Sequence, residues 1–109
     1  MLSFLRMSLN EKINTYIGFS IKSGKIVYGY ENVILNKKKA YLVLCDKALS
    51  ENSLKKVTRF VQVKAIKMYL IDALSDYFGG RQIKCVAIGE EHLASAIEKE
   101  LNNTVGGSN

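Results

Sequence analysis

The longest uninterrupted apolar stretch in this sequence is the six-residue run Ala40–Cys45. A short run that is apolar at every position, instead of every second one, is typical of a strand buried on both faces of its sheet. Such a strand requires helices on both sides. The sequence therefore favours a layered α/β fold, with further strands predicted at Met68–Ile71 and Ile83–Ile88.

Amphipathic helices are predicted between the apolar runs. The first is expected over about residues 9–23, because Ser8 and Glu11 have the spacing of a capping box and Gly24 can close the helix. Ser50 is the expected N-cap of a later helix, in which apolar residues again recur at helical spacing.

Short segments and glycines mark the remaining boundaries. Residues 26–28 form a brief apolar strand, and Gly29 opens a second short helix. A short helical segment is expected at Leu74–Phe78, and Gly89 precedes the last helix. The tail from Asn102 is rich in Asn, Gly and Ser, and we expect it to be disordered.

The alternation of helices and strands predicts a three-layer α/β/α sandwich with a small four-stranded mixed sheet. With 109 residues, the chain has the length of one domain. We expect that domain to span residues 9–101, with residues 1–8 as an N-terminal extension and helix cap and residues 102–109 as a disordered tail.

Membrane insertion and secretion are not expected. Ala40–Cys45 is far shorter than the roughly 20 apolar residues that span a bilayer as a helix. The first ten residues lack the basic segment and apolar core of a signal peptide, so a cytoplasmic location is expected. Cys45 and Cys85 each lie in an apolar run and are expected to be buried thiols, without a zinc or redox motif.

Motifs that carry catalytic chemistry are scarce. His92 is the only histidine, and it is expected on the polar side of the last helix with no nucleophile beside it, which argues against a catalytic triad. One histidine and two distant cysteines cannot supply a zinc site. Gly18 and Gly24 are separated by one residue too many for a phosphate loop. The sequence therefore predicts a protein that is not an enzyme and that needs no cofactor.

Charge is unevenly distributed along the chain. Residues 1–67 hold 13 Lys and Arg against 4 acidic residues, a balance of +9, whereas residues 68–109 hold 3 against 6, a balance of −3. Lysines near phosphates gain affinity by releasing condensed counterions, so the basic part suggests a polyanionic partner. The alternative is a basic surface that is only solvated.

The turn at Gly29 is the strongest candidate for binding. Glycine lets another backbone approach closely, and Tyr30, Glu31 and Asn32 would form the first turn of the helix that follows. Asn and Glu side chains can hydrogen-bond to base edges. Lys37–Lys39, close by in the sequence, would add phosphate attraction. In the simpler alternative, Glu31 only favours the helix dipole and the lysine run is only solvated.

Three glycines with a lysine after the second occur in Gly18-FSIKS-Gly24-Lys25-IVY-Gly29. The segments AYLVLCDKALSENSLKK and CVAIGEEHLASAI follow it in the chain. In the order and spacing of these segments, over about residues 9–101, the sequence resembles the bacterial YlxQ-type proteins. These belong to the kink-turn RNA-binding superfamily of ribosomal proteins that includes the archaeal large-subunit protein seven (Ae type).

The resemblance implies a small α/β/α sandwich that binds an RNA duplex bent at tandem sheared G·A pairs. In the superfamily, the turn that contacts those pairs reads Gly-x-Asn-Glu-x-x-Lys. Carried over by position, Gly29 matches the glycine, and Glu31 and Asn32 match the polar pair in reversed order. Leu35 stands where the superfamily has its lysine. Either Lys37 replaces that lysine in space or the second helix ends early.

A second superfamily contact comes from the loop before a Leu-Gly-x-x-x-Gly helix, which packs against the flipped-out nucleotide of the kink. Its counterpart here is Leu74-Ser75-DYF-Gly79, where Ser75 replaces the first glycine. The resemblance thus implies RNA-binding roles for Ala73, Leu74 and Ser75. Lys25 and the Lys37–Lys39 run would supply contacts to phosphates.

We therefore expect a cytoplasmic RNA-binding protein of ribosomal type. It would recognise a structured RNA, a kink-turn, by phosphate contacts and by the Gly29 turn. The expected partners are ribosomal RNA or a messenger leader, together with the ribosome. The alternative is a protein-interaction module, associated with the ribosome or with translation, that has lost kink-turn specificity.

Overall fold

The computed structural model describes the backbone of residues 2–107 and the side chains of residues 11–103. Helices and strands alternate along the chain, as the apolar runs predict. In chain order the elements are α1 (Leu2–Ser23), β1 (Ile26–Tyr28), α2 (Tyr30–Leu35), β2 (Leu42–Asp46), α3 (Glu51–Lys64), β3 (Lys67–Ile71), the 3-10 helix η1 (Leu74–Phe78), β4 (Cys85–Ile88) and α4 (Glu91–Gly107).

The four strands form one mixed sheet in the order β1-β4-β2-β3. β4 pairs antiparallel with both β1 and β2, whereas β2 and β3 are parallel. All residues of the two central strands, β2 and β4, are buried. This burial explains why the sequences of these strands are apolar without alternation.

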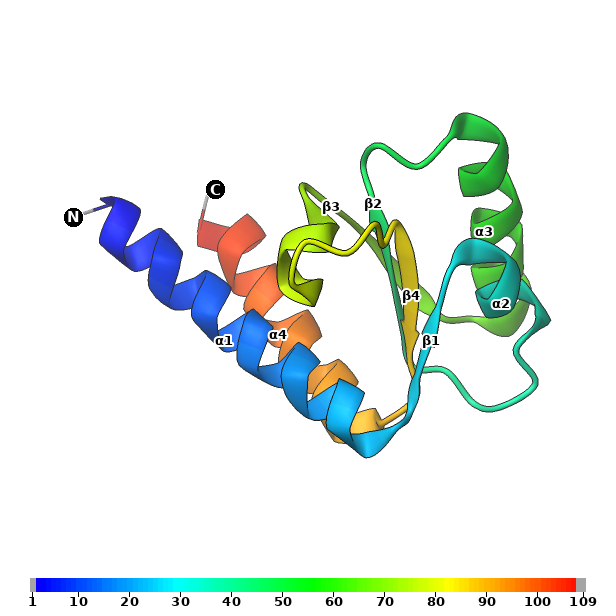
Figure 1. Cartoon of the computed structure of the whole chain (residues 1–109), viewed down its shortest axis with the longest axis horizontal. Helices are drawn as coiled ribbons and strands as arrows, with labels where there is room; N and C mark the ends of the chain where they lie inside the picture. The colour runs from blue at the N-terminus through cyan, green and yellow to red at the C-terminus, as the bar shows by residue number, and fades with distance from the viewer. Residues whose placement is uncertain (1, 108–109) are drawn as a thin grey trace.

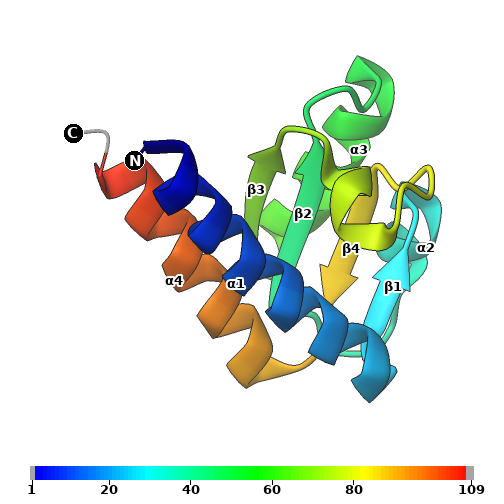
Figure 2. The same cartoon turned by 60° about the vertical axis from the view of Figure 1, so that its left-hand side comes forward.

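Helices cover both faces of the sheet (Figure 1). α1 and α4 lie side by side on one face together with η1, and α2 and α3 lie on the other (Figures 1 and 2). Each interface has its own core, with Ile17, Leu44 and Ile97 in the first and Val43 and Val57 in the second. The predicted three-layer α/β/α sandwich is therefore confirmed, and its radius of gyration of 13.4 Å is that of one domain of about 100 residues.

The strand directions define two opposite ends of the sheet, and we name each end by its glycine, as the Gly29 edge and the Gly89 edge. β1, β2 and β3 end at the edge where β4 begins, and Gly29 marks this Gly29 edge, since its N–H donates to the carbonyl of Cys85 at 2.8 Å. The same three strands begin where β4 ends. Gly89 marks this Gly89 edge, and its N–H donates to the carbonyl of Lys25 at 2.7 Å.

The first helix starts earlier than the sequence indicates. α1 begins at Leu2 instead of about residue 9, so Ser8 lies inside the helix and does not cap it. Residues 1–8 contain neither Gly nor Pro, and nothing in them interrupts a helix that has a favourable continuation. The predicted end is correct, because Gly24 follows the helix with a φ of 72° and donates to the carbonyl of Ile21.

The last helix also extends beyond its expected end. The chain from Asn102 is not a disordered tail, because α4 continues to Gly107. The first residue of the expected tail is held by a contact that the sequence does not reveal. The Tyr69 hydroxyl of β3 donates to Asn102 Oδ1 at 2.7 Å. Residues 108–109 lie outside the described residues.

Two strands are shorter at their starts than their apolar runs. β2 begins at Leu42, and β4 begins at Cys85 instead of Ile83. Ile83 is occupied elsewhere, because its N–H donates to the hydroxyl of Ser75 at 3.0 Å and its carbonyl accepts from the same hydroxyl at 3.1 Å. In the part of the chain that the structure describes, none of the helices could span a bilayer.

Candidate functional site

Gly29 connects β1 to α2 in a conformation with φ 86° and ψ 140°. L-amino acids other than glycine rarely adopt a positive φ, so this turn requires glycine. Besides the bond to Cys85, the Gly29 carbonyl accepts the N–H of Val33 at 2.9 Å. A Cβ placed on Gly29 would meet only Asn32 Nδ2, at 3.9 Å. The surface beside the turn is therefore open to an approaching molecule.

The polar pair of the turn is exposed. Glu31 and Asn32 both face solvent, whereas Val33 is fully buried and anchors α2 against the sheet. Asn32 Nδ2 donates to the carbonyl of Tyr28 at 2.9 Å, which fixes the orientation of the amide. The second N–H of that amide and its Oδ1 stay available to a ligand. Tyr30 is half-buried and packs against the core under α2 and α3.

Two basic residues at the Gly29 edge are missed by sequence reasoning. Arg81 lies over the ring of Tyr28, with its Cζ 5.4 Å from the ring centroid, and Phe78 meets the same ring edge-on at 5.8 Å. Lys84 is exposed and precedes Cys85, which pairs with Gly29. Both cations belong to the acidic third of the sequence. The antiparallel pairing of β4 with β1 brings them to the turn, and the sequence gives no direct signal for that pairing.

The second expected contact loop also lies at the Gly29 edge, but most of it serves the fold. Leu74 is fully buried, and its N–H donates to Asp46 Oδ2 at 2.8 Å. The hydroxyl of Ser75 is engaged with the backbone of Ile83. Ala73 is exposed, in the left-handed region with a φ of 51°. Of the three residues, Ala73 is exposed, Ser75 is half-buried and Leu74 is buried.

The expected lysines lie at the opposite edge of the sheet. Lys25 precedes β1, and Lys37, Lys38 and Lys39 lie between α2 and β2, all exposed. The three residues of β1 lie between Lys25 and Gly29, so the two are four steps of extended chain apart, about 13 Å. α2 ends at Leu35, so Lys37 lies beyond the helix. The structure thus divides the expected site between the two edges.

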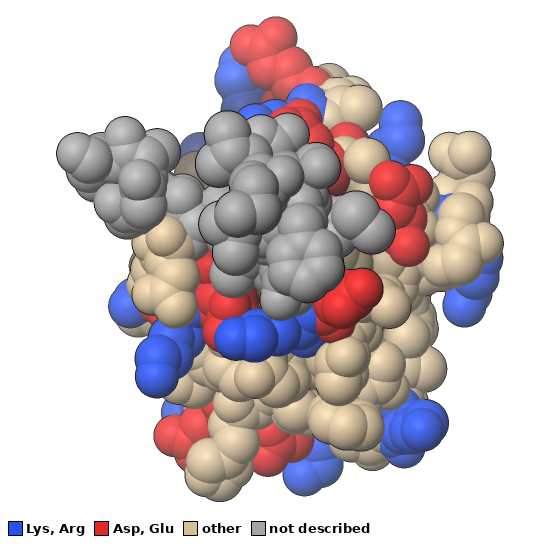
Figure 3. All heavy atoms as spheres, turned by 90° about the vertical axis from the view of Figure 1, so that its left-hand side faces the viewer, with Lys and Arg blue, Asp and Glu red and all other residues tan. Residues whose placement is uncertain are grey.

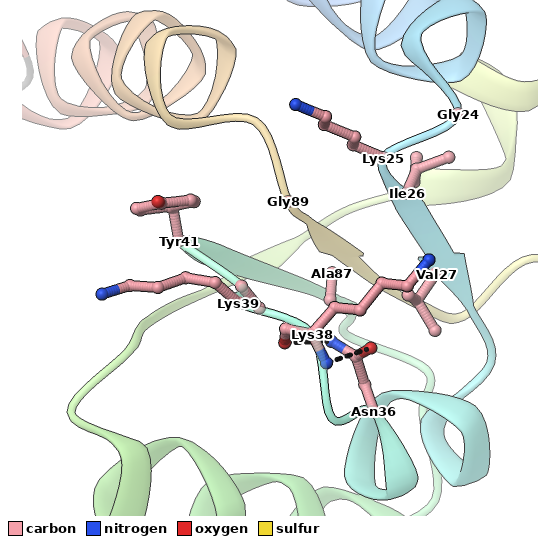
Figure 4. Close-up of a pocket in the computed structure, with 11 residues that line it drawn as sticks. Gly24, Lys25, Ile26, Val27, Asn36, Lys38, Lys39, Tyr41, Ala87 and Gly89 are labelled. Atoms are coloured by element: carbon pink, nitrogen blue, oxygen red, sulfur yellow. Dashed lines mark hydrogen bonds between the residues drawn. The ribbon is translucent and has the colours of Figure 1, made fainter.

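A cavity of about 400 Å³ opens among these lysines at the Gly89 edge (Figure 4). Its lining combines the start of β1, the end of β4 and the loop between α2 and β2. The lining residues are Gly24, Lys25, Ile26, Val27, Asn36, Lys38, Lys39, Ala40, Tyr41, Ala87 and Gly89. In Figure 4, the Lys38 side chain crosses toward Val27, whereas Lys39 extends toward the side of Tyr41.

Local sequence explains this cavity. The six-residue α2 is too short to cover the whole sheet face, and Asn36 then folds the chain back. Asn36 Nδ2 donates to the carbonyl of Lys38 at 2.9 Å, and its Oδ1 accepts the N–H of Lys38 at 3.2 Å. Gly89 allows close strand packing here, because a Cβ would lie 3.2 Å from the carbonyl oxygens of Lys25 and Lys39.

Several other titratable groups form ion pairs or cap a helix. The hydrogen bond to Glu98, at 2.6 Å, raises the pKa of Lys67. The backbone N–H of Leu93 lowers the pKa of Glu90, which caps α4, and the exposed His92 also contacts Glu90 at 3.2 Å. Figure 3 shows acidic and basic side chains interspersed over the side of α1 and α4. The described side chains contain no cluster of three residues that could hold a metal.

The two cysteines are closer together than the sequence suggests. Both are buried, as predicted, and they face each other across β2 and β4 with their sulfurs 3.7 Å apart. The hydrogen bond between them and their burial raise the pKa of the Cys85 thiol. They lie under the Gly29 turn, within the core, and are not accessible to a ligand.

No family model matches this chain, and no curated protein matches it. Its fold is known. A solved structure described as "The structure of a protein with unknown function from Bacillus halodurans C" superposes with a TM-score of 0.74 over 84% of this chain and 97% of the other. Only 13% of the residues are identical, so the similarity establishes the fold alone.

Proposed function

We propose that this protein binds structured RNA, with the Gly29 turn as the element that recognises a kink-turn. The observation that carries the proposal is the geometry of that turn. An exposed polar pair, Glu31 and Asn32, directly follows a glycine with open space beside it. A nucleic acid backbone could approach the glycine while both side chains reach base edges.

The chemistry of the turn suits base edges. The Asn32 amide offers one free N–H and one oxygen in an orientation fixed by Tyr28, and the Glu31 carboxylate accepts from amino groups of bases. A side chain that is held in place before binding loses less entropy on contact. The reversed order of this pair relative to the superfamily exchanges the positions of amide and carboxylate.

Cations at the Gly29 edge supply the phosphate contacts that position RNA. Leu35 occupies the place of the superfamily lysine and is 75% exposed. Arg81, held over Tyr28, and Lys84 bring positive charge to the same edge from β4 and the segment before it. These two residues offer an alternative to the missing lysine.

The RNA partner follows from the resemblance to kink-turn-binding ribosomal proteins. We propose ribosomal RNA or a messenger leader as the target and a cytoplasmic role in translation, within a ribonucleoprotein.

The second candidate is a protein-interaction module associated with the ribosome. The observation that favours it is Leu35 at the end of α2, because 75% of its surface is exposed and contact with another protein would remove that apolar surface from water. In that case the Gly29 turn would hold α2 in place for a protein partner.

A titration at about 150 mM salt, near physiological ionic strength, tests the proposal. A standard kink-turn RNA is compared with one whose sheared G·A pairs are changed to Watson–Crick pairs. We expect clear preference for the intact kink. Equal affinities would indicate a general phosphate binder, and no binding to either RNA would favour the protein-interaction module.

A further inference from the structure

The cavity at the Gly89 edge combines two kinds of lining. Ile26, Val27, Ala40 and Ala87 form an apolar part. Lysines and the Asn36 amide form a polar part, and none of the lining residues is acidic. A ligand that suits both parts has an apolar portion and an anionic group.

The three lysines of the cavity, Lys25, Lys38 and Lys39, are exposed. None of the ion pairs among the described side chains includes Lys25, Lys38 or Lys39. Lys39 instead lies against the ring of Tyr41, with its Nζ 5.5 Å from the centroid. Because no acidic residue lines the cavity, an anion that enters it meets positive charge without competition from a carboxylate.

We propose that this cavity binds a nucleoside monophosphate unit, with the base against the apolar lining and the phosphate within reach of Lys38. The inference rests on the proposed RNA-binding function, in which the unit is an unstacked nucleotide of the RNA. A volume of about 400 Å³ falls within the range of small-ligand sites and far exceeds the needs of inorganic phosphate alone.

The position of the cavity is compatible with RNA that also contacts the Gly29 turn. Lys25 and Gly29 lie at opposite ends of the three-residue β1, about 13 Å apart. A structured RNA several nucleotides long covers that distance. The cavity would therefore hold one nucleotide next to the region that the turn recognises, and it would add affinity for a flexible, unpaired nucleotide.

The experiment uses the full chain and adenosine 5′-monophosphate as the probe. Two-dimensional NMR follows the amide signals of Val27, Ala87 and Gly89, with adenosine and inorganic phosphate titrated in parallel. We expect the monophosphate to shift these signals at concentrations at least tenfold below those needed for either fragment. No shift at about 10 mM monophosphate, or equal effects of the fragments, would overturn the inference.

Lys38→Ala is the matched variant, and Lys12→Ala is its control. Both remove one exposed lysine, but Lys12 lies on α1 away from the cavity. Lys38→Ala is expected to weaken binding of the monophosphate about threefold to tenfold, and Lys12→Ala to leave it unchanged. An equal effect of both variants would mean that only net charge attracts the probe, which contradicts a site.

A competition experiment shows whether the bound nucleotide is free or belongs to an RNA. It also distinguishes failure of this inference from failure of the proposed function. Kink-turn RNA with an unpaired nucleotide should displace the monophosphate from the cavity. If the monophosphate binds but RNA does not, the cavity serves a free nucleotide and the proposed RNA function fails. If RNA binds at the Gly29 turn while the cavity signals stay unchanged with either probe, the cavity inference fails alone.

Discussion

The two edges of the sheet differ in how their side chains are held. At the Gly29 edge, buried groups fix the backbone, since Asp46 accepts the N–H groups of Ala48 and Leu74 at 2.7 and 2.8 Å. At the Gly89 edge, exposed lysines surround a cavity. The first edge combines a fixed turn, suited to recognition of shape, with the cations Arg81 and Lys84, whereas the second presents a run of lysines that attracts negative charge. Lys25 and Gly29 are close in the sequence, but the short strand β1 places them at opposite ends of the sheet.

Replacing Leu74 should change stability more than any other substitution considered. It tests whether this residue of the Gly29 edge serves packing or RNA binding. Leu74→Ala should lower the free energy of unfolding by about 2–5 kcal/mol, because Leu74 is fully buried in the core. Chemical denaturation measures the loss, and RNA affinity under native conditions should stay within about twofold. Ala73→Gly is the control, since it removes only an exposed methyl group from a left-handed position and should preserve stability. A stable Leu74→Ala protein with strongly reduced RNA binding would assign Leu74 to the interface.

Gly29→Ala tests whether the turn depends on its positive φ. We expect a loss of about 1–3 kcal/mol in unfolding free energy, because alanine at a φ of 86° is strained although space for its Cβ exists. Gly18→Ala provides the contrast, since Gly18 lies within α1, also has free space, and should gain up to about 1 kcal/mol. Thermal unfolding of both variants decides the point. Equal stabilities of the two would show that the turn adapts without strain.

Asn32→Ala tests whether the Gly29 edge determines specificity for the kink-turn. The variant should lose about 1–3 kcal/mol of binding free energy on the kink-turn RNA and little on the RNA without sheared pairs. Asn14→Ala, which changes an exposed asparagine of α1, should bind both RNAs like the unmodified protein. Equal losses on the two RNAs would mean that Asn32 does not recognise the kink.

Removal of the lysine run tests whether the Gly89 edge attracts RNA by charge. Replacing Lys37, Lys38 and Lys39 by Ala should weaken binding of all RNAs severalfold and should reduce the slope of log affinity against log salt by up to about 0.9 per lost phosphate contact. A control with the same loss of charge replaces three exposed lysines on helices: Lys12, Lys64 and Lys99. An unchanged slope for the first variant would remove the run from the RNA interface.

Patterns of one strand or one helix were sufficient to predict the layers of this fold. The apolar run at Ala40–Cys45 identified a buried strand and thereby helices on both faces. What the sequence could not supply was the order of the strands, because pairing depends on contacts between distant segments. That order places Arg81 over Tyr28, next to Gly29, and brings Lys25 to Gly89 at the other end of β1. The turn itself was predictable, whereas the composition of each edge was not.

The smallest expected effect is a pH dependence at the Gly89 edge, where Glu90 caps α4. Its carboxylate accepts the N–H of Leu93 at 2.6 Å, and this bond lowers the pKa of Glu90 in the folded protein. The stabilisation is therefore complete above the pKa of an unfolded glutamate and is lost as the pH falls through the lower folded value. Glu90→Gln should be slightly less stable than the unmodified protein at pH 7, and the difference should diminish as the pH falls through that value. Urea denaturation across this range measures it, and Glu91→Gln, next in the chain, controls for the loss of one negative charge near the start of the helix. A constant difference at every pH would show that the ionised carboxylate is not what stabilises this end of α4.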